Sequence, residues 1–142
     1  MIEKILLIDD EEDFLTVMSD RLTARNMQVS TASSAKEGLE KATSGTYDAV
    51  ILDLMMPEMD GIETLKILKE KKPDLEVILL TGHATIKKGI EAMKLGASDL
   101  FEKPADINAL TEKIHAAQEK KMLIVEKKNE EMIKKILATK GW

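Results

Sequence analysis

Short apolar runs alternate along this chain with longer segments in which apolar residues recur every three or four positions. The runs are typical of strands buried in a parallel sheet, and the segments are typical of amphipathic helices. We therefore predict strands at 4–8, 28–31, 49–52, 76–80 and 99–102, and helices at 12–25, 35–42, 61–71, 85–94 and from 107 onward. A strand followed by a helix, repeated five times, predicts an α/β fold: a five-stranded parallel sheet, doubly wound, with helices on both faces.

Residues that start or stop helices stand at the expected boundaries. Ser33 or Ser34 can cap the second helix, and Asp106 can cap the last one. Pro73 stops the third helix, and Gly96 follows the fourth helix at a position suited to left-handed backbone. These residues support the boundaries that the apolar pattern predicts.

Charged side chains follow three of the predicted strands. Asp9 and Asp10 end the first apolar run, Asp53 ends the third, and Lys103 follows the fifth. Because ligands of such sheets bind beyond the carboxyl ends of the strands, we expect these groups to converge. Mg²⁺ prefers oxygen ligands, and without a cation three carboxylates at close range repel one another. The sequence therefore predicts a magnesium site that accepts a phosphoryl group.

A second interpretation exists for the acidic pair alone. Asp is common at helix starts, so Asp9 and Asp10 could simply cap the helix that begins near residue 12. Asp53 and Lys103 at matching strand ends make capping an insufficient explanation.

Composition narrows the class of protein. The 142 residues suffice for one domain with a proper core, and 44% hydrophobic with 33% charged residues is typical of a soluble globular chain. There is no cysteine, which excludes disulfides and thiolate metal sites and fits a reducing cytosol. The chain shows no signal peptide and no membrane-spanning run, and its net charge of −5 gives no support to nucleic-acid binding. We expect a cytoplasmic protein with no membrane or direct nucleic-acid partner.

Four features occur together, in order and on matching elements. They are Asp9-Asp10, the segment Asp-x-x-Met-Pro-x-Met-Asp-Gly at 53–61, Thr81-Gly82 and Lys103-Pro104. On these features residues 1–117 resemble a response-regulator receiver domain, the phospho-accepting partner of sensor histidine kinases in two-component signalling. The resemblance implies a flavodoxin-like fold, a phosphoprotein, and a cis peptide bond before Pro104.

The resemblance also implies a division of roles around the metal. Asp53 would accept the phosphoryl group, and Asp10 and Asp53 would bind Mg²⁺ directly. Asp9 would act mainly through water, and the carbonyl of Met55 would be a further ligand.

Two more residues would contact the phosphoryl group itself. By the same resemblance, the Thr81 hydroxyl and the Lys103 ammonium would each bind a phosphoryl oxygen. A cation, an ammonium and a hydroxyl around the transferring group supply most of the catalysis in such reactions. Gly82 would leave room for the incoming group, and Gly61 would suit a position with relaxed backbone geometry.

The expected partners follow from the resemblance. They are a sensor histidine kinase or a phosphotransfer protein of a phosphorelay, and an output protein or domain. We expect no enzyme activity beyond self-catalysed phosphoryl acceptance and autodephosphorylation. A hydrolase that uses Asp53 as nucleophile is disfavoured, because no second Asp is placed as its general acid.

Leu100 departs from the family pattern. Receivers usually carry Tyr or Phe three residues before the lysine, and that ring swings inward when the threonine moves toward the phosphoryl group. Leu100 is most simply a core residue, and Phe101 should face the opposite side of the sheet. The departure leaves phosphoryl uptake intact but puts the usual coupling of Thr81 and residue 100 in doubt. It also motivates the alternative of a non-phosphorylated docking or dimerisation module.

Both histidines and a lysine run fit ordinary solvated surfaces. His83 flanks the expected site and is interpreted as a solvated loop residue that could tune phosphoryl lifetime, as could Met55. His115 lies on the last helix without a suggested partner. The run 69–72 is interpreted as a solvated helix end.

The last 25 residues need a separate explanation. Residues 1–117 carry 14 Lys/Arg and 22 Asp/Glu, whereas 118–142 carry 7 and 4. Apolar residues continue at three- to four-residue spacing, with Asn129 on the same stripe, as in coiled coils that use a polar residue to set register. This segment could pair in a dimer, fold back, or lead to an output domain. We divide the chain into a receiver domain, 1–118, and a helical extension, 119–142, used for self- or partner association.

Overall fold

The computed structural model describes residues 2–56, 60–82 and 86–139, and contains an alternating series of strands and helices. In chain order they are β1 (Lys4–Ile8), α1 (Glu12–Thr23), β2 (Gln28–Ala32), α2 (Ala35–Ser44), β3 (Ala49–Asp53), α3 (Gly61–Lys71), β4 (Val77–Thr81), α4 (Ile86–Lys94), β5 (Asp99–Glu102) and α5 (Ile107–Thr139). Every predicted element is present, with bounds that differ by at most two residues.

The predicted caps are confirmed by hydrogen bonds. The Ser34 hydroxyl accepts from the backbone N–H of Glu37 at 3.2 Å, and an Asp106 oxygen accepts from the N–H of Asn108 at 3.0 Å. Gly96 has a φ of 106°, which only glycine adopts readily, and it follows α4 as predicted. These local signals therefore fix where α2 and α5 begin and where the chain turns after α4.

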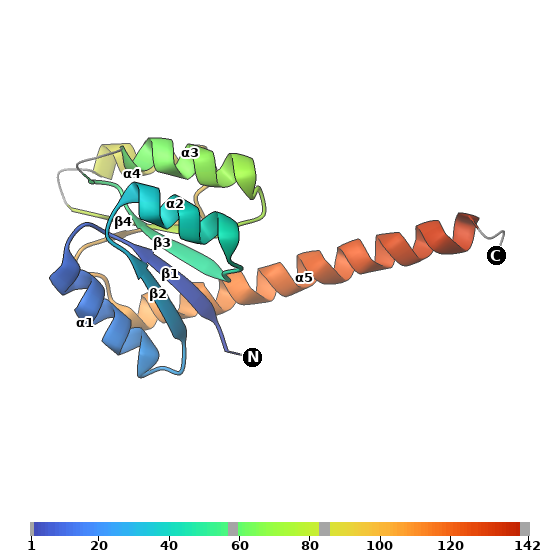
Figure 1. The fold of residues 1–142 in the computed structure, drawn as a ribbon, viewed down its shortest axis with the longest axis horizontal. Coiled ribbons are helices and arrows are strands. Elements are labelled where there is room, and N and C mark those ends of the chain that lie inside the picture. The colour runs from blue at the N-terminus through green and yellow to red at the C-terminus, as the bar shows by residue number, and fades with distance from the viewer. Residues whose placement is uncertain (1, 57–59, 83–85, 140–142) are drawn as a thin grey trace.

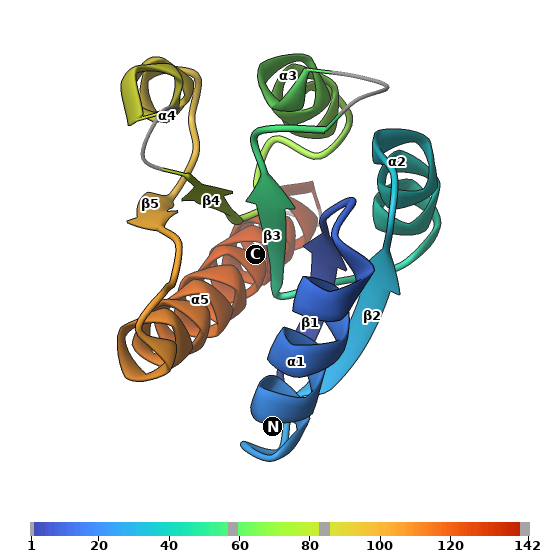
Figure 2. The same ribbon diagram turned by 90° about the vertical axis from the view of Figure 1, so that its left-hand side faces the viewer.

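The described strands form one parallel sheet in the order β2-β1-β3-β4-β5. Helices α1 and α5 cover one face, and α2, α3 and α4 cover the other (Figures 1 and 2). The chain passes from β1 outward to β2 and then returns to β3 on the other side. This reversal of strand order lies between β1 and β3, the two strands that carry Asp9, Asp10 and Asp53, where parallel sheets bind ligands.

Side chains of the central strands alternate between two cores. Leu6 and Leu52 belong to the core under α2, α3 and α4, whereas Leu7 and Ile51 belong to the core under α1 and α5. Both faces of these strands are covered, which explains their continuous apolar runs. The strands are thereby held in register, and their carboxyl ends present the acids at one edge.

Helix α5 continues far beyond the domain. Ala117 is its last buried residue among those described, yet the helix runs unbroken to Thr139 and projects into solvent (Figure 1). The extended C-terminal helix predicted from the sequence is therefore present. In this structure it does not fold back over the domain.

Acids at the amino ends of the strands meet bases on α5, and we call these contacts the amino-edge pairs. They are His115–Glu3 before β1, Lys121–Asp48 at 3.3 Å before β3, Lys120–Glu76 at 2.9 Å and Lys128–Asp74 at 2.9 Å before β4, and Lys113–Asp99 at 3.2 Å at the start of β5. They tie α5 to four strand starts along more than four helical turns. His115 is exposed, as predicted, and its Nδ1 atom hydrogen-bonds the Glu3 carboxylate, a partner that the sequence did not suggest.

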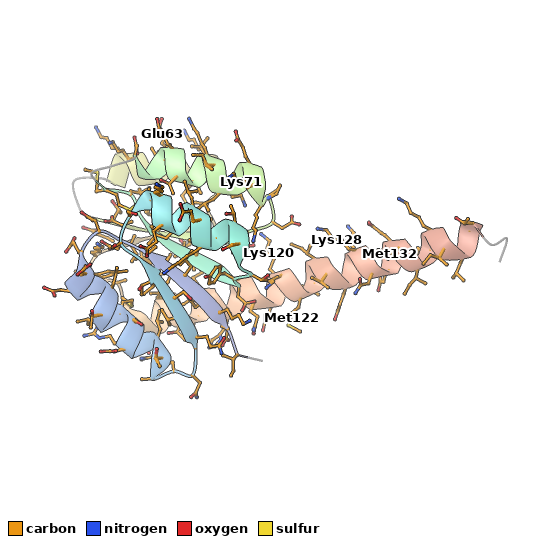
Figure 3. The ribbon with its side chains drawn as sticks, in the orientation of Figure 1. Glu63, Lys71, Lys120, Met122, Lys128 and Met132 are labelled. Carbon is orange, nitrogen blue, oxygen red and sulfur yellow. The ribbon has the colours of Figure 1, made fainter. Side chains whose placement is uncertain are left out.

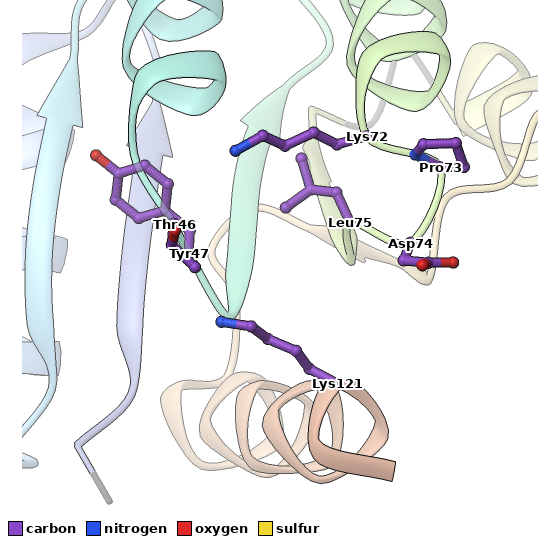
Figure 4. Close-up of a pocket in the computed structure, with 7 residues that line it drawn as sticks. All are labelled: Thr46, Tyr47, Lys72, Pro73, Asp74, Leu75 and Lys121. Atoms are coloured by element: carbon purple, nitrogen blue, oxygen red, sulfur yellow. The ribbon is translucent and has the colours of Figure 1, made fainter. Parts of the chain in front are cut away.

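A pocket of about 270 Å³ lies beside these pairs (Figure 4). Tyr47 and Leu75 line it from the loops before β3 and β4, and Lys121 reaches toward it from α5. Lys72 donates to the Gly45 carbonyl at 2.6 Å, and Lys69 donates to the Leu75 carbonyl at 3.0 Å. The run 69–72 is thus not merely a solvated helix end, because two of its lysines bind the adjoining loops.

Within the described residues, no helix is both long and apolar enough to cross a bilayer.

Candidate functional site

Three carboxylates converge at the carboxyl edge of the sheet. Asp9 and Asp10 follow β1, Asp53 is the last residue of β3, and one oxygen from each lies within 4.8 Å of the others. Asp9 is 2% and Asp53 4% exposed, so two of the three negative charges are withdrawn from water. The convergence predicted from the sequence is confirmed.

Lys103 brings a single ammonium into this cluster. Its Nζ atom lies 2.7 Å from Asp9 Oδ2 and 3.8 Å from Asp53 Oδ2. The peptide bond between Lys103 and Pro104 is cis, as the resemblance implied. Burial alone would lower the pKa of Lys103, but the hydrogen bond to Asp9 and the charge of Asp53 outweigh it and raise that pKa. The Lys103 side chain therefore stays positively charged beside two buried acids.

The two buried acids are held differently. Asp9 accepts two hydrogen bonds, from Lys103 and from the backbone N–H of Glu11 at 2.9 Å. Asp53 accepts from the N–H of Met55 at 3.2 Å through Oδ1, while its Oδ2 faces the more distant Lys103 ammonium. The Oδ2 atom of Asp53, the outer oxygen of this carboxylate, is thus held less tightly by its neighbours than either oxygen of Asp9.

Helix capping does not account for the acidic pair. The residue at the N-cap of α1 is Glu11, and its side chain makes no capping hydrogen bond. Asp9 does accept from Glu11 N–H, but its other oxygen is bound to Lys103 and faces the cluster. Asp9 therefore belongs to the carboxylate cluster at the strand edge and is not simply a cap of α1.

The electrostatics of the cluster fit a hard divalent cation. Burial, followed by the charge of Asp9, raises the pKa of Asp53 from 3.8 to about 6, against the Met55 hydrogen bond and the Lys103 charge. A carboxyl group in such an environment gains a proton or a cation readily. Oxygen donors from Asp9, Asp10 and Asp53, two of them buried, are the ligand chemistry that Mg²⁺ prefers.

Thr81 ends the neighbouring strand, β4. It is fully buried, its carbonyl accepts from the backbone N–H of Lys103 at 2.8 Å, and its hydroxyl donates to the Gly82 carbonyl at 3.1 Å. Among the described residues, a Cβ atom at Gly82 would meet no atom within 4 Å, so the space beside this residue is open. The Thr81 hydroxyl is directed at the backbone of the next residue.

Leu100 packs into the core on the α4 side of the sheet. A Cβ atom at Gly89 of α4 would lie 2.6 Å from a Leu100 methyl carbon, so the two residues are in close contact. Phe101 joins the opposite core, beside α1 and α5, which confirms the prediction that it faces the other side. The absence of a side chain at Gly89 therefore provides the space that Leu100 occupies.

Gly61 is required for a reason other than the predicted one. Its φ is not positive, but a Cβ atom there would lie 2.5 Å from Leu54 Cα and 2.6 Å from the Leu54 carbonyl oxygen. Its N–H donates to that same carbonyl at 3.2 Å. Gly61 is thus demanded by close approach of two backbones behind the site, and not by backbone freedom.

Sequence reasoning did not assign two residues that contact Lys103. Phe14 places its ring 4.3 Å from the ammonium, and Glu11 places an oxygen 3.6 Å from it. The place of Phe14, one turn after the acidic pair, is the signal that could have indicated contact with the site. His83 and Pro57 lie outside the described residues.

Comparison with known proteins identifies one family. Residues 5–115 match the response regulator receiver domain model. A solved receiver domain protein from Clostridium thermocellum superposes with a TM-score of 0.83 at 38% identity, covering 87% of this chain and 99% of that one.

Curated relatives are longer regulators. The photosynthetic apparatus regulatory protein RegA of Cereibacter sphaeroides is 33% identical over 115 residues, which cover 81% of this chain and 62% of RegA. The alkaline phosphatase synthesis transcriptional regulatory protein PhoP of Bacillus subtilis is 35% identical over 135 residues, which cover 93% of this chain and 56% of PhoP. The matches thus span a little over half the length of these relatives.

Proposed function

The chain belongs to the response regulator receiver domain family, and on that premise we propose that it takes a phosphoryl group onto Asp53 from a sensor histidine kinase or a phosphotransfer protein. The observation that carries the proposal is the buried Asp53 carboxylate, whose outer oxygen lies 3.8 Å from the Lys103 ammonium beside Asp9 and Asp10. Phosphorylation then switches a surface that binds an output partner.

The chemistry uses Asp53 as nucleophile. Its Oδ2 attacks phosphorus while the bond from phosphorus to the donor's imidazole nitrogen breaks, and the product is an acyl phosphate on the aspartate. The Met55 N–H fixes Oδ1 and so orients Oδ2. Lys103 neutralises negative charge that spreads over the phosphoryl oxygens, and the Thr81 hydroxyl donates to another of them.

A magnesium ion would complete this site. Asp10, Asp53 and the Met55 carbonyl would hold it directly, and Asp9, whose two oxygens already accept hydrogen bonds, would act through water. The ion supplies positive charge that offsets the repulsion between the carboxylates and the incoming phosphoryl group.

The receiver itself turns over no substrate. Receivers of this family are generally non-enzymatic, and we assign this chain only self-catalysed phosphoryl acceptance and autodephosphorylation. Its histidine-containing donor and its output protein are the partners. Transcriptional regulation is a property named for relatives such as PhoP, which extend well beyond the matched region.

The direct test is intact mass after incubation with acetyl phosphate and Mg²⁺. We expect a gain of one phosphoryl group that is lost in Asp53→Asn and in the presence of a chelator. Exposed Asp13 on α1 provides a matched control, and Asp13→Asn should retain the mass gain. Absence of any Asp53-dependent gain would overturn the proposal and favour a docking module.

Switching is the part of the proposal that Leu100 affects. Leu100 fills the space over Gly89, so α4 and β5 are coupled by apolar contact and not by a ring that follows Thr81. We expect Leu100→Tyr to change phosphoryl uptake by no more than about threefold, because the residue lies outside the charged cluster and makes no contact that stabilises the transition state. Initial rates from acetyl phosphate test this, and a large loss would show that residue 100 takes part in the chemistry.

A further inference from the structure

The projecting part of α5 carries an exposed apolar stripe, which we call the α5 seam. It consists of Met122, Val125, Asn129, Met132 and Ile136, spaced three and four residues apart. Its apolar members are 42% to 61% exposed in the single chain. Figure 3 labels Met122 and Met132 on the helix beyond the domain. Apolar side chains at this spacing are the a and d positions of a coiled coil.

We propose that the α5 seam is covered by the seam of a second copy of this chain, in a parallel, in-register, two-stranded coiled coil. A stripe with alternating three- and four-residue spacing is complementary to a copy of itself, because each apolar side chain fits between those of the facing helix. Ile133, which is 57% exposed beside the stripe, adds apolar surface to the same contact.

Charges beside the seam select the parallel orientation. Lys121, Lys128 and Lys135 occupy one flank at seven-residue spacing, and Glu126, Ile133 and Lys140 occupy the sequence positions of the other. In a parallel pair each Lys121 faces Glu126 of the second helix. In an antiparallel pair the lysine flanks would face each other, which sets like charges side by side.

Asn129 selects the register. In a parallel, in-register pair it faces its own counterpart, and the two amides can hydrogen-bond. In a shifted or antiparallel pair the amide would face an apolar side chain such as Val125 or Met132, and burying it without a partner is costly. The central polar residue of the seam therefore fits one arrangement.

The domain stabilises the helical conformation that pairing requires. A short helix of this length is marginal alone because nucleation is costly, but here it continues an α5 already held by the buried Ile114 and the amino-edge pairs. At 100° per residue the centre of the seam lies about 100° around the helix from Ala117 and about 40° from Ile114, both of which face the sheet. The seam begins at Met122, beyond that last buried residue, so pairing leaves the buried contacts of α5 with the sheet in place, while Lys121, which pairs with Asp48 in the single chain, would also meet Glu126 of the second helix.

Light scattering and sedimentation on the full chain, with and without acetyl phosphate, test the pairing. We expect a concentration-dependent dimer that Ile136→Lys weakens at least about tenfold, because it places two like charges in the seam. Leu137→Lys is the matched control: the neighbouring side chain is 44% exposed against 49% for Ile136, but lies off the seam, so its effect should stay within about twofold. A monomer in both states overturns the proposal, as does a larger effect of Leu137→Lys.

Disulfide cross-linking tests the orientation. The chain has no cysteine, so a single introduced thiol can pair only with its own counterpart. Ile136→Cys should cross-link efficiently at the far end of a parallel seam, and Leu137→Cys should not. A dimer in which Ile136→Cys fails to cross-link overturns the parallel arrangement. Phosphoryl uptake measured by mass on the same variants is expected to be unchanged, so this outcome is independent of the proposed function.

Discussion

Both edges of the sheet carry several acids, but they balance them in opposite ways. At the amino edge, each acid of the pairs has its own base on α5, as with Lys120 and Glu76 or Lys113 and Asp99. At the carboxyl edge, Asp9, Asp10 and Asp53 lie in one cluster, and the Lys103 ammonium pairs with Asp9 and Asp53. The amino edge is electrostatically satisfied, whereas the carboxyl edge retains a surplus of negative charge.

The balanced charges of the amino edge stabilise the fold, whereas the unbalanced charges of the carboxyl edge are suited to binding or chemistry. A balanced set of ion pairs fixes the position of a helix and needs nothing further. A buried surplus of negative charge is destabilising unless a cation or a proton compensates it, so it persists where binding or chemistry requires it. The same type of side chain should therefore have opposite effects on stability at the two edges.

The largest effect should come from removing the Lys103 ammonium from the carboxylate cluster. Lys103→Met should slow phosphoryl uptake by roughly 100-fold, because one charge that stabilises the transition state is lost. Lys113→Met, which breaks an aspartate pair at the amino edge, should leave the rate within about twofold. Initial rates from acetyl phosphate at saturating Mg²⁺ measure both. Equal losses would contradict the division between the edges.

The next effect is a gain of stability. In metal-free buffer Asp53→Asn should raise the free energy of unfolding by up to about 3 kcal/mol above pH 6, the equivalent of a two-unit rise in pKa. Below about pH 3.8 the carboxyl group is protonated in both states, so the gain vanishes; it grows as the pH rises and is complete above about 6. Urea unfolding across this pH range measures it.

The matched change at the amino edge should have the opposite sign. Asp48 is also buried, but its carboxylate accepts from the Lys4 N–H at 2.7 Å and pairs with Lys121. Asp48→Asn should therefore lower stability under the same conditions. A gain for Asp48→Asn comparable to that for Asp53→Asn would remove the contrast.

A smaller loss is expected at Glu76. This buried carboxylate binds the Ser98 hydroxyl and the Lys120 ammonium, which is largely exposed. Glu76→Gln keeps the shape and removes the charge, and should cost about 1 kcal/mol in the free energy of unfolding. Urea unfolding measures the loss, while phosphoryl uptake should be unaffected. A change in uptake would show that the edges communicate through β4.

The smallest effect concerns the exposed pair Lys128–Asp74. The hydrogen bond and charge of Lys128 lower the pKa of the Asp74 carboxyl group. Lys128→Ala should return that pKa toward 3.8, which NMR titration of the carboxyl carbon can follow, with no measurable change in stability. A clear loss of stability would mean that the pair, although exposed, is needed to hold α5.

Sequence reasoning was strongest where chemistry follows directly on an apolar run. Asp9, Asp10 and Asp53 stand immediately after buried strands, so the topology of a parallel sheet sufficed to bring them together. The same reasoning could not find the amino-edge pairs, because Glu3 and His115 are 112 residues apart and meet only through the path of α5 across the sheet. It also could not supply the reason for Gly61, which depends on how closely Leu54 approaches.

The uninterrupted course of α5 gives the molecule a lever arm. Beyond Lys128, which pairs with Asp74 of the domain, the helix continues for 11 residues to Thr139, and at about 1.5 Å per residue this makes an arm of roughly 17 Å. A rotation of about 5° of the part of α5 held by the domain displaces the far end by roughly 1.5 Å, about one residue of helical rise. Small rearrangements within the domain are thereby magnified at the tip.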